Sequence, residues 1–213
     1  MPAIIKEKEI DKDHPIFYLN DDHGRNGSSL GTNTRRNQKS IKKVFSYFGG
    51  GRGRVLVLSD MPNDKGYPLS KFWLSDEMLA SLEAEVVAEQ YDDGAITSPK
   101  DGKFKGDNTK VLPLSNDDFS LVVGRAVMCF CGTSTKACGV PDNLESFLSE
   151  VVRVLKVNGA ALLHGDEANG KKAGEEWTAM VNVVAKKYDE SVVFTILKYG
   201  GVFRGIKIRK KSV

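Results

Sequence analysis

The side chains best suited to chemistry stand beside short apolar runs of the sequence. Asp107 and Asn108 form a polar turn after a glycine, Arg125 closely follows a Val-Val pair, and His164 ends another apolar run. A carboxylate and an amide can hydrogen-bond a polar ligand, a guanidinium binds anions, and an imidazole exchanges protons near neutral pH. Because core filling does not easily explain a charged group at a strand end, Arg125 is expected to face a cleft.

Three elements are needed to position these groups. The runs 119–128 and 160–164 are predicted to be strands. Between them, Pro141-Asp142-Asn143 opens a stretch in which apolar residues recur at helical spacing up to Leu155, as expected for an amphipathic helix. A strand, a helix and a second strand in this order form a parallel crossover.

The rest of the sequence predicts further strands and helices around this crossover. Further strands are expected at 54–58, 71–74, 192–197 and 202–208, the last two joined by a Gly-Gly turn and therefore antiparallel. Further helices are expected at 37–48, 76–86 and 177–188. Residues 91–106 are interpreted as a loop or a weak hairpin.

Length and composition favour one domain with a decorated N-terminus. The chain has 213 residues, of which 28% are charged and 40% hydrophobic, close to the averages of soluble domains. Residues 1–35 are rich in polar residues and predict an irregular arm or lid, followed by a single domain at 36–213. No apolar run approaches the length of a membrane helix, and the N-terminus lacks a signal-peptide core, so a cytoplasmic protein is expected.

Charge and cysteine content argue against two other classes of site. A net charge of +3 makes nucleic acid an unlikely partner, although the basic segment 35–43 leaves RNA binding as a weaker alternative. The three cysteines, Cys129, Cys131 and Cys138, favour buried thiols in a reducing compartment over a disulfide framework. A zinc site would need a fourth ligand, and no metal is predicted.

The order of motifs in 106–165 resembles the second half of a class I S-adenosylmethionine (AdoMet)-dependent methyltransferase. The matching elements are Gly106-Asp107, Leu112-Pro113, the strand Phe119-Ser120-Leu121-Val122-Val123 and the helix end Arg153-Val154-Leu155-Lys156-Val157-Asn158-Gly159. The resemblance implies an α/β, doubly wound Rossmann-like fold with a mostly parallel seven-stranded sheet that ends in an antiparallel hairpin. It also implies AdoMet as the cofactor.

The resemblance assigns site residues to both halves of the cleft. Asp107 and Asn108 match positions that contact the adenine, and Gly124 and Arg125 lie near the transferred methyl group, where Arg125 is a candidate for binding an anionic substrate or the AdoMet carboxylate. His164 is the candidate base, with a structural role as the alternative.

The methionine half matches less well. Ser59 and Asp60 begin the loop expected to cradle the methionine moiety, but 59–66 contains a single glycine where the family has several. Trp73, Leu74 and Ser75 are aligned with the end of the second strand, which puts Trp73 where the family has an acid for the ribose. The expected function is therefore methyl transfer from AdoMet to an unidentified, small-molecule acceptor. The alternative is a methyltransferase-like binding or assembly module without catalysis.

Overall fold

The computed structural model describes residues 1–16, 47, 53–58, 84–91, 103–106, 111–128, 140–165 and 170–212. These residues build one eight-stranded sheet. Its strands are β1 (Ile4–Glu9), β2 (Gly53–Leu58), β3 (Ala84–Tyr91), β4 (Lys103–Gly106), β5 (Phe119–Met128), β6 (Leu155–Gly165), β7 (Val192–Tyr199) and β8 (Val202–Lys210).

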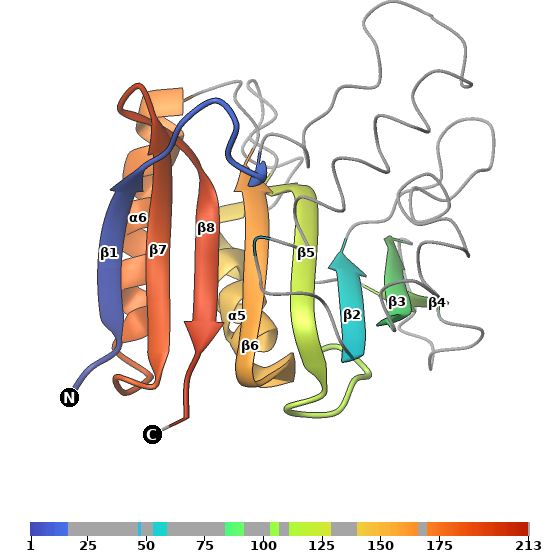
Figure 1. The fold of residues 1–213 in the computed structure, drawn as a ribbon. Helices are drawn as coiled ribbons and strands as arrows, with labels where there is room; N and C mark the ends of the chain where they lie inside the picture. The colour runs from blue at the N-terminus through green and yellow to red at the C-terminus, as the bar shows by residue number, and fades with distance from the viewer. Residues whose placement is uncertain are drawn as a thin grey trace, which may run out of the picture.

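The strand order is β1-β7-β8-β6-β5-β2-β3-β4 (Figure 1). All neighbouring pairs are parallel except those of β8, which is antiparallel to both β6 and β7. The short turn between β7 and β8 requires this, since a parallel pair needs a long crossover. The predicted mostly parallel sheet with one antiparallel hairpin is thus confirmed.

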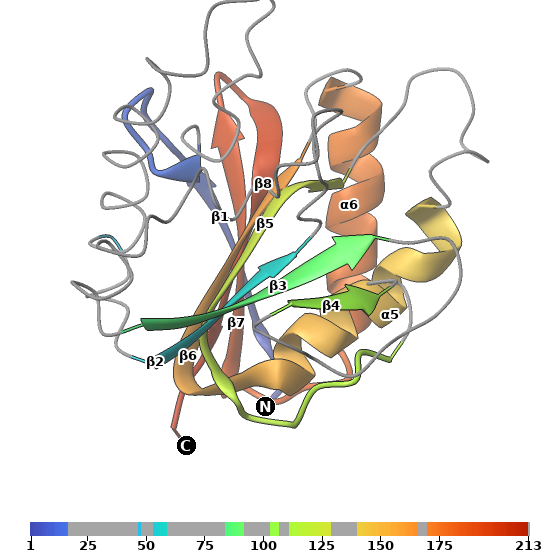
Figure 2. The same cartoon turned by 90° about the vertical axis from the view of Figure 1, so that its right-hand side faces the viewer.

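Two helices, α5 (Val140–Val154) and α6 (Gly170–Ala185), cover one face of the sheet (Figure 2). We call the opposite face the far face. Alternate residues of the strands point toward the helices, as the period of two in a strand requires. A doubly wound fold also needs helices on the far face, and that part of the prediction falls mainly on residues outside those described.

The core lies between the sheet and these helices. From the strands come Leu56, Leu58, Val122, Ala161, Leu163, Phe194, Ile196, Ile206 and Ile208, and from the helices Phe147, Leu148, Val151, Val152, Trp177, Val181 and Val184. The Trp177 indole stacks on the Phe203 ring with 5.9 Å between centroids. Burying side chains of this kind contributes about 1.5–3 kcal/mol each, so this apolar layer is a main source of the fold's stability.

Most predicted elements from 54–58 and from 119 onward are confirmed, and the N-terminal half needs corrections. The predicted irregular arm 1–35 contains β1, which makes eight strands rather than seven. The helix predicted at 76–86 overlaps β3, and β4 lies inside the predicted loop 91–106. Pairing with β2 decides the state of β3, and this non-local contact is invisible to helical spacing. The strand predicted at 71–74 lies outside the described residues.

Candidate active site

The sheet has a topological switch point between β2 and β5. Counted from β2, the order β4-β3-β2-β5-β6 is the 3-2-1-4-5 order of nucleotide-binding α/β sheets. In such sheets the ligand binds beyond the carboxyl ends of the strands, where the order reverses. At this edge Leu58, Gly124 and Leu163 are register partners across three strands. Gly124 has no side chain, which leaves room for a ligand beside the switch point.

A β-bulge brings together the two residues predicted to be catalytic. The β5–β6 register runs from Gly124↔Leu163 to Met128↔Gly165, so Arg125 and the two residues after it oppose His164 alone. Bulges re-aim side chains and are frequent beside active sites. Arg125 and His164 thus lie on adjacent strands at the carboxyl edge of the sheet.

His164 is fully buried. Because Leu163 packs toward the helices, the alternation along β6 places the His164 side chain on the far face. On the neighbouring strand its register partner is Gly205. A buried imidazole at this position suits either a proton acceptor or a structural residue, as the sequence analysis proposed.

The other predicted site residues lie outside the described residues, and only their place in the sequence can be stated. Ser59 and Asp60 directly follow β2, and Asp107 and Asn108 directly follow β4. The carboxyl ends of both strands are at the edge where Gly124 lies. The same holds for Trp73, Leu74 and Ser75 only in that they precede β3 in the sequence.

The register corrects the alignment of Trp73. The strand paired with β2 on the side away from β5 is β3, which ends at Tyr91, so position 73 does not mark the end of the second strand of the nucleotide-binding order. Asp92 and Asp93 follow β3 directly in the sequence. The sequence analysis missed these carboxylates. The signal for them was an Asp-Asp-Gly turn directly after an apolar, β-branched run.

The segment after β1 approaches the same edge. Ile10 donates its N–H to the Lys198 carbonyl at the end of β7, and the chain then runs past the ends of β7 and β8 toward β6 (Figure 1). Ile16 is fully buried, and a Cβ built on Gly205 would lie 2.5 Å from its Cδ1 atom. We call residues 10–16 the strap. It covers the far face beside His164.

A histidine holds the strap in place. His14 Nδ1 accepts the Ile16 N–H at 3.2 Å, so in the neutral ring Nε2 carries the proton and donates to Tyr47 Oη at 3.1 Å. Lys207 Nζ lies 3.3 Å from the same oxygen and 4.4 Å from the Tyr47 ring centroid. Burial, helped by the charges of Lys8 and Lys207 and opposed by Asp11, lowers the pKa of His14 to about 4.

The described residues give no sign of a metal site or a membrane span. No group of three or more His, Cys, Asp or Glu side chains within the described ranges could hold a metal ion. None of the described helices is long and apolar enough to cross a membrane.

Comparisons with known proteins reach the fold but no closer relative. No protein-family model and no curated protein sequence matches the chain. Among solved structures, it is similar to a candidate S-adenosyl-L-methionine-dependent methyltransferase from Methanococcus maripaludis (12% identity, 89% of this chain and 99% of that chain, TM-score 0.46). It is also similar to a SAM-dependent methyltransferase from Aquifex aeolicus (13%, 82% and 92%, 0.44). A third match is a candidate rRNA methylase from Clostridium thermocellum (12%, 87% and 99%, 0.45). With TM-scores below 0.5, these likenesses carry no argument about the site.

Proposed function

We propose that the chain is an AdoMet-dependent methyltransferase with a small-molecule acceptor. The observation that carries the proposal is the strand order, in which a nucleotide-binding half β4-β3-β2-β5-β6 is completed by an antiparallel β8 inserted before β7. The motifs Gly106-Asp107 and Phe119–Val123 stand at β4 and β5 of this order, as the family resemblance requires. Strand order and motif order therefore support the same function.

The proposed binding residues follow from the ends of the parallel strands. Ser59 and Asp60 after β2 would face the methionine moiety, and Asp107 and Asn108 after β4 the adenine. For the ribose hydroxyls we propose Asp92 or Asp93 after β3, since carboxylates accept hydrogen bonds from paired hydroxyls. The room beside Gly124 and the polar character of these strand ends fit a nucleoside carrying an amino-acid group.

The chemistry asks mainly for alignment. AdoMet, when bound, supplies a methyl group on a sulfonium. The acceptor nucleophile forms a bond to the methyl carbon while the carbon–sulfur bond breaks, and its electron pair stays on sulfur. An in-line displacement of this kind gains most from positioning. His164 is proposed to take the acceptor's proton where one is released, and Arg125 to orient an anionic group of the acceptor or the cofactor.

Calorimetric titration with AdoMet and with S-adenosylhomocysteine tests the proposal. Saturable binding is expected, and Asp107→Ala should weaken it about tenfold, the loss of one to two hydrogen bonds to a charged acceptor. Asp117→Ala is the matched control, because Asp117 pairs with Lys210 at the opposite edge of the sheet. No saturable binding at millimolar AdoMet would overturn the proposal. Equal affinity of Asp107→Ala and the unmodified protein would overturn the placement of the adenine.

A second candidate is a binding or assembly module that has lost catalysis. The single glycine in 59–66 favours it, because a tight backbone approach to the methionine moiety usually needs more. The two candidates differ in one result. Binding of AdoMet without methyl transfer to any member of a small-molecule acceptor panel supports the module, and one transferred methyl group excludes it.

A further inference from the structure

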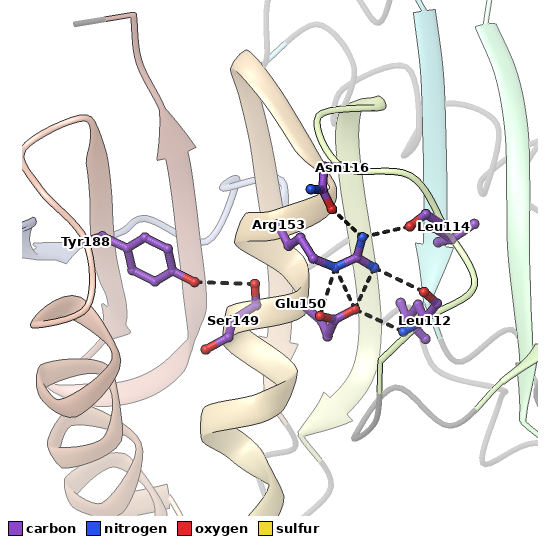
Figure 3. Close-up of polar contacts among 7 residues, drawn as sticks. All are labelled: Leu112, Leu114, Asn116, Ser149, Glu150, Arg153 and Tyr188. Atoms are coloured by element: carbon purple, nitrogen blue, oxygen red, sulfur yellow. Dashed lines mark hydrogen bonds and ion pairs between the residues drawn. The ribbon is translucent and has the colours of Figure 1, made fainter.

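Two charged residues of α5 grip the segment that leads into β5 (Figure 3). Arg153 Nη1 donates to the Leu114 carbonyl at 2.7 Å and to Asn116 Oδ1 at 2.8 Å. Its Nη2 donates to the Leu112 carbonyl at 3.1 Å. The planar guanidinium suits this work because its five N–H donors have a fixed geometry.

Glu150 completes the arrangement one helical turn earlier. Its Oε2 accepts the Leu112 N–H at 2.9 Å and an Arg153 Nη2–H at 2.7 Å. Leu112 is therefore held at both its N–H and its carbonyl, and its side chain is buried. We call Glu150 and Arg153 the clamp. Glu150 is only 8% exposed, so solvent screens this ion pair less than a surface pair.

The clamp stands directly after the residues proposed to contact the adenine. Gly106 is held in register with Tyr91 at the end of β4, and the next residue held by side chains is Leu112. Only residues 107–111 lie between these two points. Asp107 and Asn108 thus belong to a short connection with both ends anchored.

We infer that Glu150 and Arg153 are positioning residues for the adenine side of the AdoMet site, acting through Leu112. The inference rests on the proposed function. Without the clamp, the next backbone anchor is the Asp117 N–H on the Arg153 carbonyl at 3.0 Å. The connection then grows from residues 107–111 to residues 107–116, twice the length. Each doubling of a flexible connection makes its closure roughly threefold less favourable.

The first experiment measures ligand affinity in Arg153 variants. Arg153→Lys keeps a positive charge but cannot reach both carbonyls and Glu150 together, so AdoMet affinity should fall at least about threefold. 5′-Methylthioadenosine, which lacks the amino-acid group, should lose the same factor, because the effect is on the adenine side. The matched control is Lys187→Ala, which removes an ion pair between Glu145 of α5 and the chain after α6 but leaves Leu112 untouched. Its affinities should not change.

A conservative pair of variants separates positioning from general loosening. Glu150→Gln retains an oxygen that accepts the Leu112 N–H, whereas Glu150→Ala does not. Affinity should therefore be largely kept in the first and lost in the second. If both lower the melting temperature equally yet leave the dissociation constants of both ligands at the unmodified value, the clamp is structural only and the inference is overturned.

Hydrogen exchange on the unmodified protein protects the test against variants that fail to fold. AdoMet should slow amide exchange in the peptide covering residues 107–114. Slowing elsewhere without any in this peptide would contradict the inference while leaving AdoMet binding intact. Absence of AdoMet binding by the unmodified protein, in contrast, would overturn the proposed function and the inference with it.

Discussion

At the scale of single residues, His14 links the strap to pH. Its ring is held neutral by burial and by two lysines, while Tyr47 and the Ile16 amide use both of its nitrogens. Protonation would remove the Nδ1 acceptor and place a third cation beside Lys8 and Lys207. The strap is therefore built for the neutral imidazole.

We predict that this residue makes stability depend on pH. The folded pKa of about 4 is below the ordinary 6.5, so folding favours the neutral form. Its stabilisation is complete above pH 6.5 and is lost as the pH falls from 6.5 through 4. In urea unfolding at pH 7.5 and 4.5, the unmodified protein should lose more stability than His14→Gln, which does not titrate. Parallel losses would contradict the role of His14.

Gly205 is a second residue with a specific steric duty. A Cβ there would lie 2.1 Å from the Leu163 carbonyl oxygen and 2.5 Å from Ile16 Cδ1. Gly205→Ala should therefore push β8 from β6 and lift the strap, at a cost of roughly 1–3 kcal/mol in unfolding free energy. Gly200→Asn is the control, because nothing lies within 4 Å of a Cβ at Gly200 and asparagine tolerates its φ of 58°. A Gly205→Ala protein as stable as the control would refute this packing.

At the scale of elements, the apolar stripe of α5 decides how firmly the helix is seated. Leu148 is fully buried and belongs to the main core. Leu148→Ala should lower the unfolding free energy by about 2–5 kcal/mol, the usual cost of a cavity at such a site. Ser146→Ala on the exposed side of the same helix should change it by less than about 0.5 kcal/mol. Chemical denaturation of the two variants gives the comparison.

The same elements show what a sequence can reveal about this fold. The helix beginning near Pro141 and the hairpin at 192–208 were predictable, because their residues make a local period and a local turn. β3 was mistaken for a helix, since its Ala, Glu and Gln residues favour helices and its Val residues continue a helical spacing. Its pairing with β2 spans more than twenty residues of chain, and no local pattern encodes such a contact.

The site was predictable to a similar degree. Arg125 and His164 were singled out separately, and their juxtaposition depends on a bulge that only the β5–β6 register reveals. The strap could not be foreseen, because its anchors at Tyr47, Gly205 and Lys207 are distant in sequence. For the same reason the clamp was read only as part of a helix motif. The sequence shows its two residues, and the structure shows what they hold.

At the scale of the whole molecule, β1 is the open edge of the sheet and carries alternating charges. Lys6 and Lys8 pair with Thr195 and Leu197, and Glu7 pairs with Ile196, which faces the helices. The lysines therefore lie on the far face and Glu7 on the other. When two such edges pair antiparallel, opposed side chains share a face. Lysine would meet lysine and glutamate would meet glutamate.

We predict that this pattern keeps two copies from joining through β1. Replacing both Lys6 and Lys8 with valine removes the like charges from one face and should strengthen self-association. Sedimentation velocity over a range of concentrations compares this double variant with the unmodified protein. A double variant with two arginines at these positions retains the charge and is the control. Equal association of the valine and arginine variants would show that the edge charges have no such effect.

The pairing of β1 with β7 also bears on how the protein is made. Ile4 is the register partner of Val193, and Glu9 of Lys198, so the first strand stays unpaired until the ribosome has added nearly all of the sheet. The strap waits even longer, since Ile16 packs on Gly205. Contacts of such long sequence separation form slowly. During synthesis the edge of the sheet that holds Arg125 and His164 is therefore assembled first, and its cover is added last.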